Sequence, residues 1–439
     1  MQAIDTLIIP RWIVPIEPAH TVLSDHALAI DQGRIVALEP TAQALSRFAP
    51  RETIRRPQHV LLPGLVNLHT HAGMTLLRGV GDDLPLMQWL QTRIWPLEGK
   101  LLSDAFVTDG TALACMEMLQ GGVTTFNDMY FYPEAAVHAA QQAGMRIAAS
   151  IIVIDFPSAY APDADSYLNQ GLALRDTLND EPLVSFCLAP HAPYSVSDAA
   201  FARVQTLSEQ LNLPVHVHLH ETQTEIEDSL RHYGCRPLAR LERLGLLGPQ
   251  LIGVHAVHLT PLEIEQLAQL GCHLAHCPSS NLKLGSGIAA TAAWREAGIN
   301  FGLGTDSSAS NNRLDLWSEM RLSALLAKGS TGNATAASAM QTLQAATLDG
   351  ARALGLEQQI GSLVPGKAAD LCLVNLGEPS SQPIYDVLSH LVYVAGREQV
   401  SDVWVAGQQR IVAAQYHDPA HKAALMARLA AWQPQLKSL

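Results

Sequence analysis

The sequence predicts a (β/α)8 barrel with a small β-sandwich domain built from both ends of the chain. A central block of about 290 residues alternates apolar β-rich runs with helical patterns, and eight such units are typical of this barrel. β-rich segments flank the block on both sides. An open doubly wound sheet would also alternate, but no GxGxxG motif follows the first strand, so the barrel is favoured.

The flanking segments share one pattern, short strands around glycine turns. TLIIPRWIVP (6–15) and HALAIDQGRIVALEP (26–40) are expected strands, and Asp31-Gln32-Gly33 supplies a hairpin turn. GSLVPGKAADLCLVN (361–375) and DVWVAGQQRIVAA (402–414) repeat the pattern near the other end. We therefore expect residues 1–62 and 358–418 to form one β-sandwich domain, followed by a C-terminal helix and tail over 419–439.

Residues 63–357 form the expected catalytic barrel. Helical patterns such as ALACMEMLQ (112–120), AAFARVQTLSEQL (199–211) and LEIEQLAQL (262–270) separate its strands. The predicted strands lie at 64–71, 122–128, 146–154, 184–191, 215–220, 251–256, 273–278 and 300–306.

Composition excludes several classes of protein. The 28 Lys+Arg and 41 Asp+Glu give a net charge of −13, which disfavours nucleic-acid and anionic-membrane binding. An apolar share of 48% excludes a disordered chain. Neither a signal peptide nor an apolar run of about 18 residues is recognisable. The six cysteines form no CxxC pair, so we expect reduced thiols and a cytoplasmic protein.

The 18 histidines are the unusual feature of the composition, and several fall at strand ends. His69 and His71 close the first strand as an HxH motif, which turns both imidazoles to the same side. His218, His255 and Asp306 end later strands. The carboxyl ends of barrel strands carry the active site. Three imidazoles with one carboxylate therefore predict a site for a divalent metal that activates water.

Other histidines have simpler interpretations. His216 lies deeper in its strand than His218 and is expected to be a buried, hydrogen-bonded core residue. Cys272-His273 and His276-Cys277 suggest a zinc finger, but no second Cys/His pair lies at finger spacing, so we reject that interpretation.

Six motifs resemble the amidohydrolase superfamily, and within it the 5-methylthioadenosine/S-adenosylhomocysteine deaminase group. They are PGLVNLHTH (63–71), HAPYSVS (191–197), HVHLHE (216–221), VHAVHL (254–259), HCPSSNLKLGSG (276–287) and GTDSSASNN (304–312). The resemblance implies a homo-oligomeric enzyme that deaminates a small-molecule nucleoside, 5′-methylthioadenosine or also adenosine or S-adenosylhomocysteine, to the inosine analogue and ammonia.

The resemblance also implies the metal ligands, which are His69, His71, His218 and Asp306, with zinc as the metal. No lysine lies between Lys100 and Lys283, which excludes a bridging carboxylated lysine on the second to sixth strands and favours one metal per subunit. Attack at C6 of adenine then uses three catalytic residues by resemblance. Glu221 is the general acid/base that carries a proton to N1, His255 orients the attacking water, and Asp306 accepts its proton.

Three further residues match substrate contacts of the group, alongside Glu221 and Asp306. His191 resembles the histidine that contacts N3 of the purine, and Glu98 resembles the glutamate that accepts from the ribose hydroxyls. Trp89 matches an aromatic residue near the 5′ side, although packing alone also explains a Trp in a helix.

One departure concerns the substrate tail. Group members that take S-adenosylhomocysteine use two arginines against its carboxylate, but this chain has Ile151 at one expected place and no Lys or Arg in DFPSAYAPDADSY (155–167). We therefore expect methylthioadenosine to be preferred.

The alternatives are a guanine or oxopurine deaminase and an s-triazine or N-ethylammeline chlorohydrolase. A dihydroorotase- or hydantoinase-like enzyme and an inactive scaffold protein are more distant ones. Glu98 disfavours free bases, the missing lysine disfavours ring amidases, and the intact metal and acid set disfavours an inactive relative.

Overall fold

The computed structural model describes residues 1–437, and within them an eight-stranded parallel barrel forms the centre of the molecule. Each strand pairs with the next in chain order, as buried parallel strands linked by helices do. An isolated bridge between Thr70 and Asp306 joins the first strand to the segment after the last. The strands are β6 (Leu65–Thr70), β7 (Val123–Asp128), β8 (Arg146–Val153), β9 (Val184–Pro190), β10 (Val215–Leu219), β11 (Leu251–His255), β12 (His273–His276) and β13 (Asn300–Leu303). The predicted barrel is therefore confirmed.

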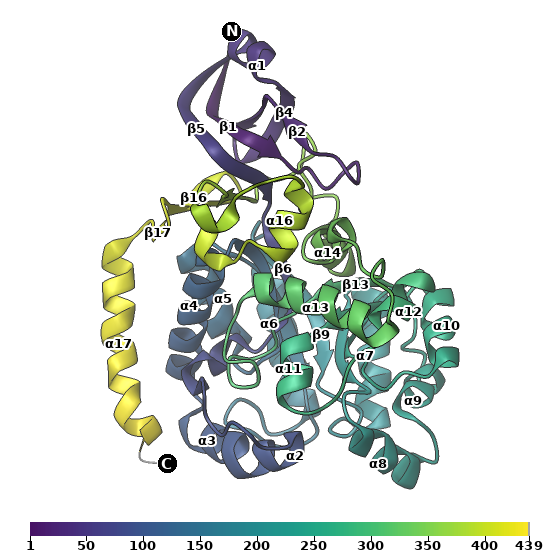
Figure 1. Ribbon diagram of the computed structural model, residues 1–439. Coiled ribbons are helices and arrows are strands. Elements are labelled where there is room, and N and C mark those ends of the chain that lie inside the picture. Colours follow the sequence, from purple (N-terminus) through teal and green to yellow (C-terminus); the bar gives the residue numbers. More distant parts are fainter. Residues whose placement is uncertain (438–439) are drawn as a thin grey trace.

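Helices between these strands and after the last of them cover the outside of the barrel (Figure 1). Many begin at a Ser, Thr or Asp whose side chain accepts from a backbone N–H of the first turn, as at Ser103, Ser197 and Thr222. They are α4 (Asp104–Gln120), α5 (Pro133–Ala143), α6 (Ala164–Leu178), α7 (Asp198–Leu211), α8 (Gln223–Tyr233), α9 (Pro237–Arg243), α10 (Pro261–Gln269), α11 (Pro278–Lys283), α12 (Thr291–Glu296), α13 (Leu316–Thr331), α14 (Ala339–Ala345) and α15 (Leu348–Ala353).

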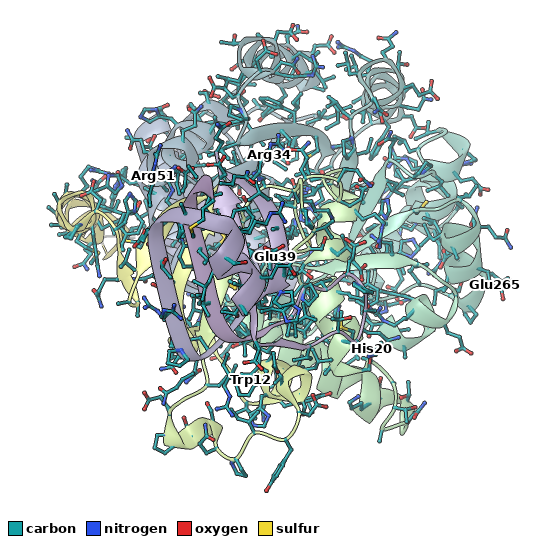
Figure 2. The ribbon with its side chains drawn as sticks, turned by 90° about the horizontal axis from the view of Figure 1, so that it is seen from above. Trp12, His20, Arg34, Glu39, Arg51 and Glu265 are labelled. Atoms are coloured by element: carbon teal, nitrogen blue, oxygen red, sulfur yellow. The ribbon has the colours of Figure 1, made fainter. Side chains whose placement is uncertain are left out.

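Strands from both termini join in one mixed sheet at the end of the barrel opposite α2 and α3 (Figure 1). Figure 2 looks onto this sheet, with Arg34, Glu39 and Arg51 on its N-terminal strands and Glu265 on α10 beside the barrel. The strands are β1 (Gln2–Ile13), β2 (Leu23–Ser24), β3 (His26–Asp31), β4 (Arg34–Pro40), β5 (Phe48–Pro63), β14 (Leu371–Asn375), β15 (Val400–Val405), β16 (Gln408–Val412) and β17 (Gln415–Tyr416).

Three details of the region around the terminal sheet bear on the sequence predictions. The expected hairpin turn is present, and Gln32 and Gly33 both adopt positive φ, of 48° and 77°. The strand expected over 361–375 forms only from Leu371, because Pro365 and Gly366 place a turn before it. A short helix, α1 (Thr41–Arg47), was not expected.

The C-terminal helix α17 (Pro419–Lys437) lies along the side of the barrel (Figure 1). Arg428 and Trp432 both donate hydrogen bonds to the Asp109 carboxylate on α4, and Leu425 is buried. Residues 438–439 of the expected tail lie outside the described part of the chain.

A buried ion pair connects the barrel with the terminal sheet. Arg146, at the start of β8, donates to both Asp370 oxygens over 3.1 and 3.3 Å, and Asp370 also accepts from the backbone of Ala406. No helix in the described residues has the length and apolarity that a membrane crossing requires.

The segment after β6 covers the end of the barrel that carries the strand carboxyl ends. It contains the 3-10 helix η1 (Ala72–Leu77) and then one continuous helical stretch. That stretch consists of α2 (Leu86–Trp89), a π-helical turn η2 (Leu90–Ile94) and α3 (Trp95–Leu101). π-helical turns are rare and are frequently found at functional sites.

Candidate active site

Four imidazoles and a carboxylate converge at the carboxyl ends of three barrel strands and the segment after a fourth. His69 lies on β6 and His71 directly follows it, His218 lies on β10, and His255 ends β11. Asp306 follows β13. His255 and Asp306 have φ of 70° and 58°, a strained conformation for residues with a Cβ. Such strain, held by the surrounding fold, is typical of functional sites.

The distances between these groups match a metal-ligand set. The Nε2 atoms of His69 and His218 lie 3.2 Å apart, and Asp306 Oδ1 lies 3.3 Å from His69 Nε2 and 3.2 Å from His71 Nε2. Tetrahedral ligands with bonds of about 2.0–2.1 Å are about 3.3–3.4 Å from one another. The donor set therefore fits a divalent transition metal.

In two of these histidines, a hydrogen bond to a backbone carbonyl keeps the proton on Nδ1. Nδ1 of His218 donates to the carbonyl of His191 over 2.8 Å, and Nδ1 of His71 donates to the carbonyl of Met129. In a neutral imidazole the proton on Nδ1 leaves a lone pair on Nε2. Both Nε2 atoms are thereby prepared to bind a cation, as outer hydrogen bonds do in metal sites.

The Asp306 carboxylate is held on its outer side by three serines. Ser280 and Ser310 donate their hydroxyls to Oδ2 over 2.5 and 2.8 Å, and the Ser307 amide donates to Oδ1 over 2.8 Å. Burial would raise the pKa of Asp306, but hydrogen bonds with His69 and His71 and the charge of His71 hold it well below its ordinary value. Asp306 is therefore an anion at neutral pH.

Burial lowers the pKa of three histidines of the group, but the net direction of the shift differs between them. It lowers the pKa of His69 to about 4 and that of His218 well below its ordinary value. It would lower the pKa of His71 too, but the hydrogen bond and charge of Asp306 raise it. Two neutral imidazoles are thus ready to bind a metal without losing a proton first.

A second carboxylate faces this group. Glu221, two residues after β10, is 6% exposed, and its Oε2 lies 3.8 Å from Nε2 of His255. Burial raises the pKa of Glu221, although His255 opposes the shift. A buried carboxyl with a raised pKa beside a water-activating site is suited to carry protons.

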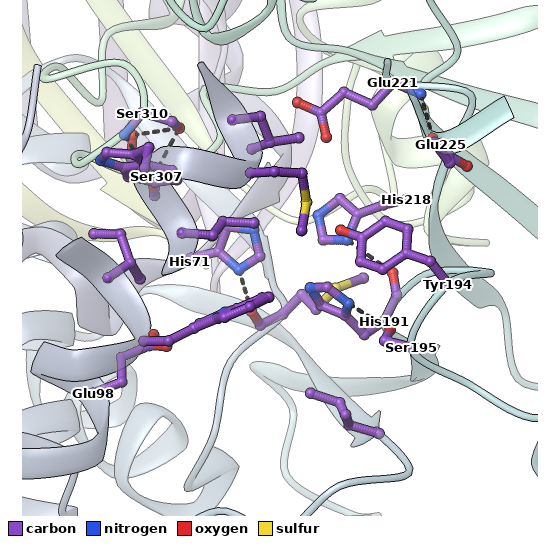
Figure 3. Close-up of a pocket in the computed structure, with 18 of the residues that line it drawn as sticks. His71, Glu98, His191, Tyr194, Ser195, His218, Glu221, Glu225, Ser307 and Ser310 are labelled. Carbon is purple, nitrogen blue, oxygen red and sulfur yellow. Dashed lines mark hydrogen bonds between the residues drawn. The ribbon is translucent and has the colours of Figure 1, made fainter. Parts of the chain in front are cut away.

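These groups open into a cavity of about 850 Å³. His71 and His218 lie between Glu221 on one side and Glu98 on the other (Figure 3). The cavity wall contains the predicted residues Trp89, Glu98, His191, His218, Glu221, His255 and Asp306, whereas His69 is fully buried behind it. No Lys or Arg from the described residues lines the cavity, although Glu225 and Asp228 do.

The three residues expected near the substrate have specific partners. Glu98 accepts a hydrogen bond from the Tyr130 hydroxyl over 2.7 Å, and burial raises its pKa to about 7. His191 Nδ1 lies 2.8 Å from the Ser195 hydroxyl, and burial lowers its pKa to about 3. The Trp89 indole donates to the carbonyl of Val80 over 3.0 Å while the ring lines the cavity.

The loop that lacks the arginines expected for a substrate carboxylate contributes to the cavity wall. Residues 156–159 of the arginine-free loop line the cavity, as do Ile152 and Ile154 of the preceding strand and its end. Ile151 itself does not line the cavity and packs against Gly171 of α6.

Several residues of the site were not found from the sequence. Glu225 accepts from the backbone N–H groups of His220 and Glu221 over 3.0 and 2.8 Å. The pattern Thr222-x-x-Glu225 marks a helix start and was a usable indication. Tyr130 and Ser195 carry no such local pattern, because only the folded chain brings Tyr130 to Glu98 and turns Ser195 towards His191.

Comparison with known proteins gives consistent results. A model of the amidohydrolase family matches residues 60–410. A 5-methylthioadenosine/S-adenosylhomocysteine deaminase from Teredinibacter turnerae is 45% identical over 93% of this chain and 92% of its own, and one from Saccharophagus degradans is 43% identical over 92% and 91%.

Solved structures agree with these sequence matches. An adenosine deaminase from Xanthomonas campestris with bound zinc is 50% identical, superposes with a TM-score of 0.98, and covers 100% of both chains. Atrazine chlorohydrolase from Arthrobacter aurescens, 24% identical with a TM-score of 0.90 over 97% of this chain and 99% of its own, shares the fold. The family model and the relatives together show that the chain belongs to the amidohydrolase family and is a hydrolase, as its motifs predicted.

Proposed function

We propose that the protein is a zinc-dependent hydrolytic deaminase of adenosine-type nucleosides, with 5′-methylthioadenosine as its preferred substrate. The observation that carries the proposal is the arrangement of the cavity. A set of metal-binding groups faces the proton carrier Glu221 on one side, and Glu98 lies on the other side. The similarity to deaminases, one of them solved with bound zinc, supports the reaction class and the metal.

The residues that would hold zinc are His69, His71, His218 and Asp306. When bound, the metal lowers the pKa of a coordinated water and so supplies a nucleophile near neutral pH. His255 is the alternative nitrogen ligand by distance, since its ring lies in a group with His69 and His218. In our proposal it orients the attacking water instead, because its Nε2 faces Glu221.

Deamination adds water across the C6–N1 bond and expels ammonia. Glu221 gives a proton to N1 as the oxygen bonds to C6, and protons from the water pass through Glu221 and Asp306 to the departing amine. The product is the inosine analogue. Glu98 accepts from the vicinal ribose hydroxyls, and His191 contacts the purine at N3, which requires its Nε2 to carry the proton and Ser195 to donate to Nδ1.

The preference for methylthioadenosine follows from the charge of the cavity wall. The whole cavity wall contains five acidic residues and no Lys or Arg among the described residues, so a carboxylate tail would find no cationic side chain there. The neutral methylthio group instead meets apolar side chains such as Leu86, Met87 and Phe156. An unpaired carboxylate is costly to place beside like charges.

A substrate screen tests this proposal. Ammonia release is measured for methylthioadenosine, adenosine, S-adenosylhomocysteine, guanine and an s-triazine, together with the metal content of the purified protein. We expect about equimolar zinc and a kcat/KM for methylthioadenosine at least about tenfold above that for S-adenosylhomocysteine. Comparable values for the two nucleosides would refute the preference, and release only from guanine or the triazine would refute the reaction.

A further inference from the structure

The segment after β12 contacts three groups of the site without supplying any of the proposed ligands or proton carriers. Its residues come from α11 and the turn that follows, within the motif at 276–287. Ser280 donates to Asp306 over 2.5 Å, Asn281 lies 2.8 Å from His255, and Ser286 donates to Glu221 over 3.3 Å. One short segment therefore connects residues at or beyond the carboxyl ends of three different strands.

The contact between Asn281 and His255 determines which nitrogen of that imidazole carries the proton. The amide Oδ1 of Asn281 faces His255 Nδ1, and an amide oxygen only accepts hydrogen bonds. Nδ1 of His255 must then carry the proton, so the neutral ring has its lone pair on Nε2. That nitrogen is the one that faces Glu221.

We propose that Asn281 is a positioning residue that fixes the tautomer and ring orientation of His255. The opposite tautomer would present an N–H towards Glu221 and the attacking water, and His255 could no longer accept a hydrogen bond there. Ser286 holds Glu221 from the same turn, so the segment also sets the separation between His255 and Glu221.

The local fold keeps Asn281 in place. Asn281 is 1% exposed, its backbone N–H donates to the carbonyl of Cys277, and its backbone carbonyl accepts from the backbone N–H of Ser286 over 2.8 Å. Nδ2 of Asn281 is buried and has no hydrogen-bond partner among the described residues. An unpaired buried donor is unfavourable for stability, which is consistent with a role in function rather than in packing.

The test compares Asn281→Leu, which keeps the volume but removes the acceptor, with Asn281→Asp, which keeps an oxygen at the same place. Leu282→Ala, at an exposed position of the same helix, is the control for disturbance of α11. We expect Asn281→Leu to lower kcat by about 10- to 100-fold with KM nearly unchanged, and Asn281→Asp to retain most of kcat. Leu282→Ala is expected to match the unaltered protein.

A second readout does not depend on activity. In metal-free protein labelled with ¹⁵N in its histidine rings, long-range ¹H–¹⁵N spectra show which nitrogen of each ring carries the proton. The His255 signals are assigned from their loss in His255→Gln. We expect the Nδ1–H form in the unaltered protein and in Asn281→Asp, and the Nε2–H form to appear in Asn281→Leu.

The expected change in kcat rests on the proposed deaminase activity, but the tautomer spectra do not. Failure of the positioning role of Asn281 can therefore be distinguished from failure of the proposed function. An unchanged tautomer in Asn281→Leu overturns the positioning role, and so does an Asn281→Asp variant as impaired in kcat as Asn281→Leu. If Asn281→Leu does not fold, Asn281→Ala takes its place with the same expectations.

Discussion

The titration of Glu98 gives a quantitative test of its proposed contact with the ribose. Burial raises the pKa of Glu98 to about 7, and the hydrogen bond from Tyr130 partly opposes that rise. The ionised carboxylate only accepts hydrogen bonds, whereas the protonated group has one O–H donor and fewer lone pairs for the two ribose hydroxyls. The ionised fraction is about nine-tenths at pH 8 and about one-tenth at pH 6, so binding that depends on Glu98 weakens about tenfold.

The assay separates Glu98 from other titrating groups by a ratio of substrates. kcat/KM is measured between pH 5.5 and 8.5 for adenosine and for 2′,3′-dideoxyadenosine, which lacks the hydroxyls. Groups that act on the purine affect both substrates and cancel in the ratio, since kcat/KM reports the free enzyme. We expect the ratio to fall about tenfold from pH 8 to pH 6.

Two variants determine the sign of the effect. Tyr130→Phe removes a hydrogen bond that lowers the pKa of Glu98, so the fall in the ratio should move to higher pH. Glu98→Gln should make the ratio independent of pH. A constant ratio in the unaltered protein, or a fall that moves to lower pH in Tyr130→Phe, would show that Glu98 does not hold the ribose as an anion.

Three further predictions follow from the site and the core. Glu221→Gln should keep zinc, measured by elemental analysis, but lower kcat by about 10²- to 10⁴-fold, and near-normal turnover would mean another group carries the proton. His71→Ala should lose most of the metal, because it removes one of four ligands; full occupancy after dialysis would exclude His71 from the set. Asp370→Ala should lower the free energy of unfolding, measured by urea denaturation, by about 3–5 kcal/mol, since Arg146 is left buried without its partner. The double change Arg146→Met with Asp370→Leu should recover most of that loss, and a single-variant loss below about 1 kcal/mol would contradict the argument.

The sequence predicted the barrel closely because its strands are buried on both faces and read as apolar runs, several of which carry a polar residue at or near the carboxyl end. β10, for example, lies at Val215–Leu219 within the predicted 215–220. The groups at strand ends were predictable for the same reason, since a histidine after such a run must lie at the barrel mouth. The covering helices α2 and α3 carry Trp89 and Glu98, which only the resemblance indicated.

Several partners of these groups could not be predicted, because they lie on segments that are distant in the chain. Tyr130 follows β7 and Glu98 lies on α3, so nothing in either local pattern indicates their hydrogen bond. Asn281 is similar, because its function depends on where His255 lies after folding. Tautomers and pKa values depend on such contacts and on burial, and both exist only in the folded chain.

The bridge between Thr70 and Asp306 has a consequence for synthesis of the protein. The carboxylate of the proposed ligand set lies just beyond the last barrel strand, and its backbone amide donates to the carbonyl of His69 on the first. A nascent chain that has not yet released residue 306 from the ribosome has the three imidazoles of the proposed ligand set but lacks its carboxylate. Metal capture should therefore follow closure of the barrel, and a bound metal would mark a chain whose synthesis has passed that point.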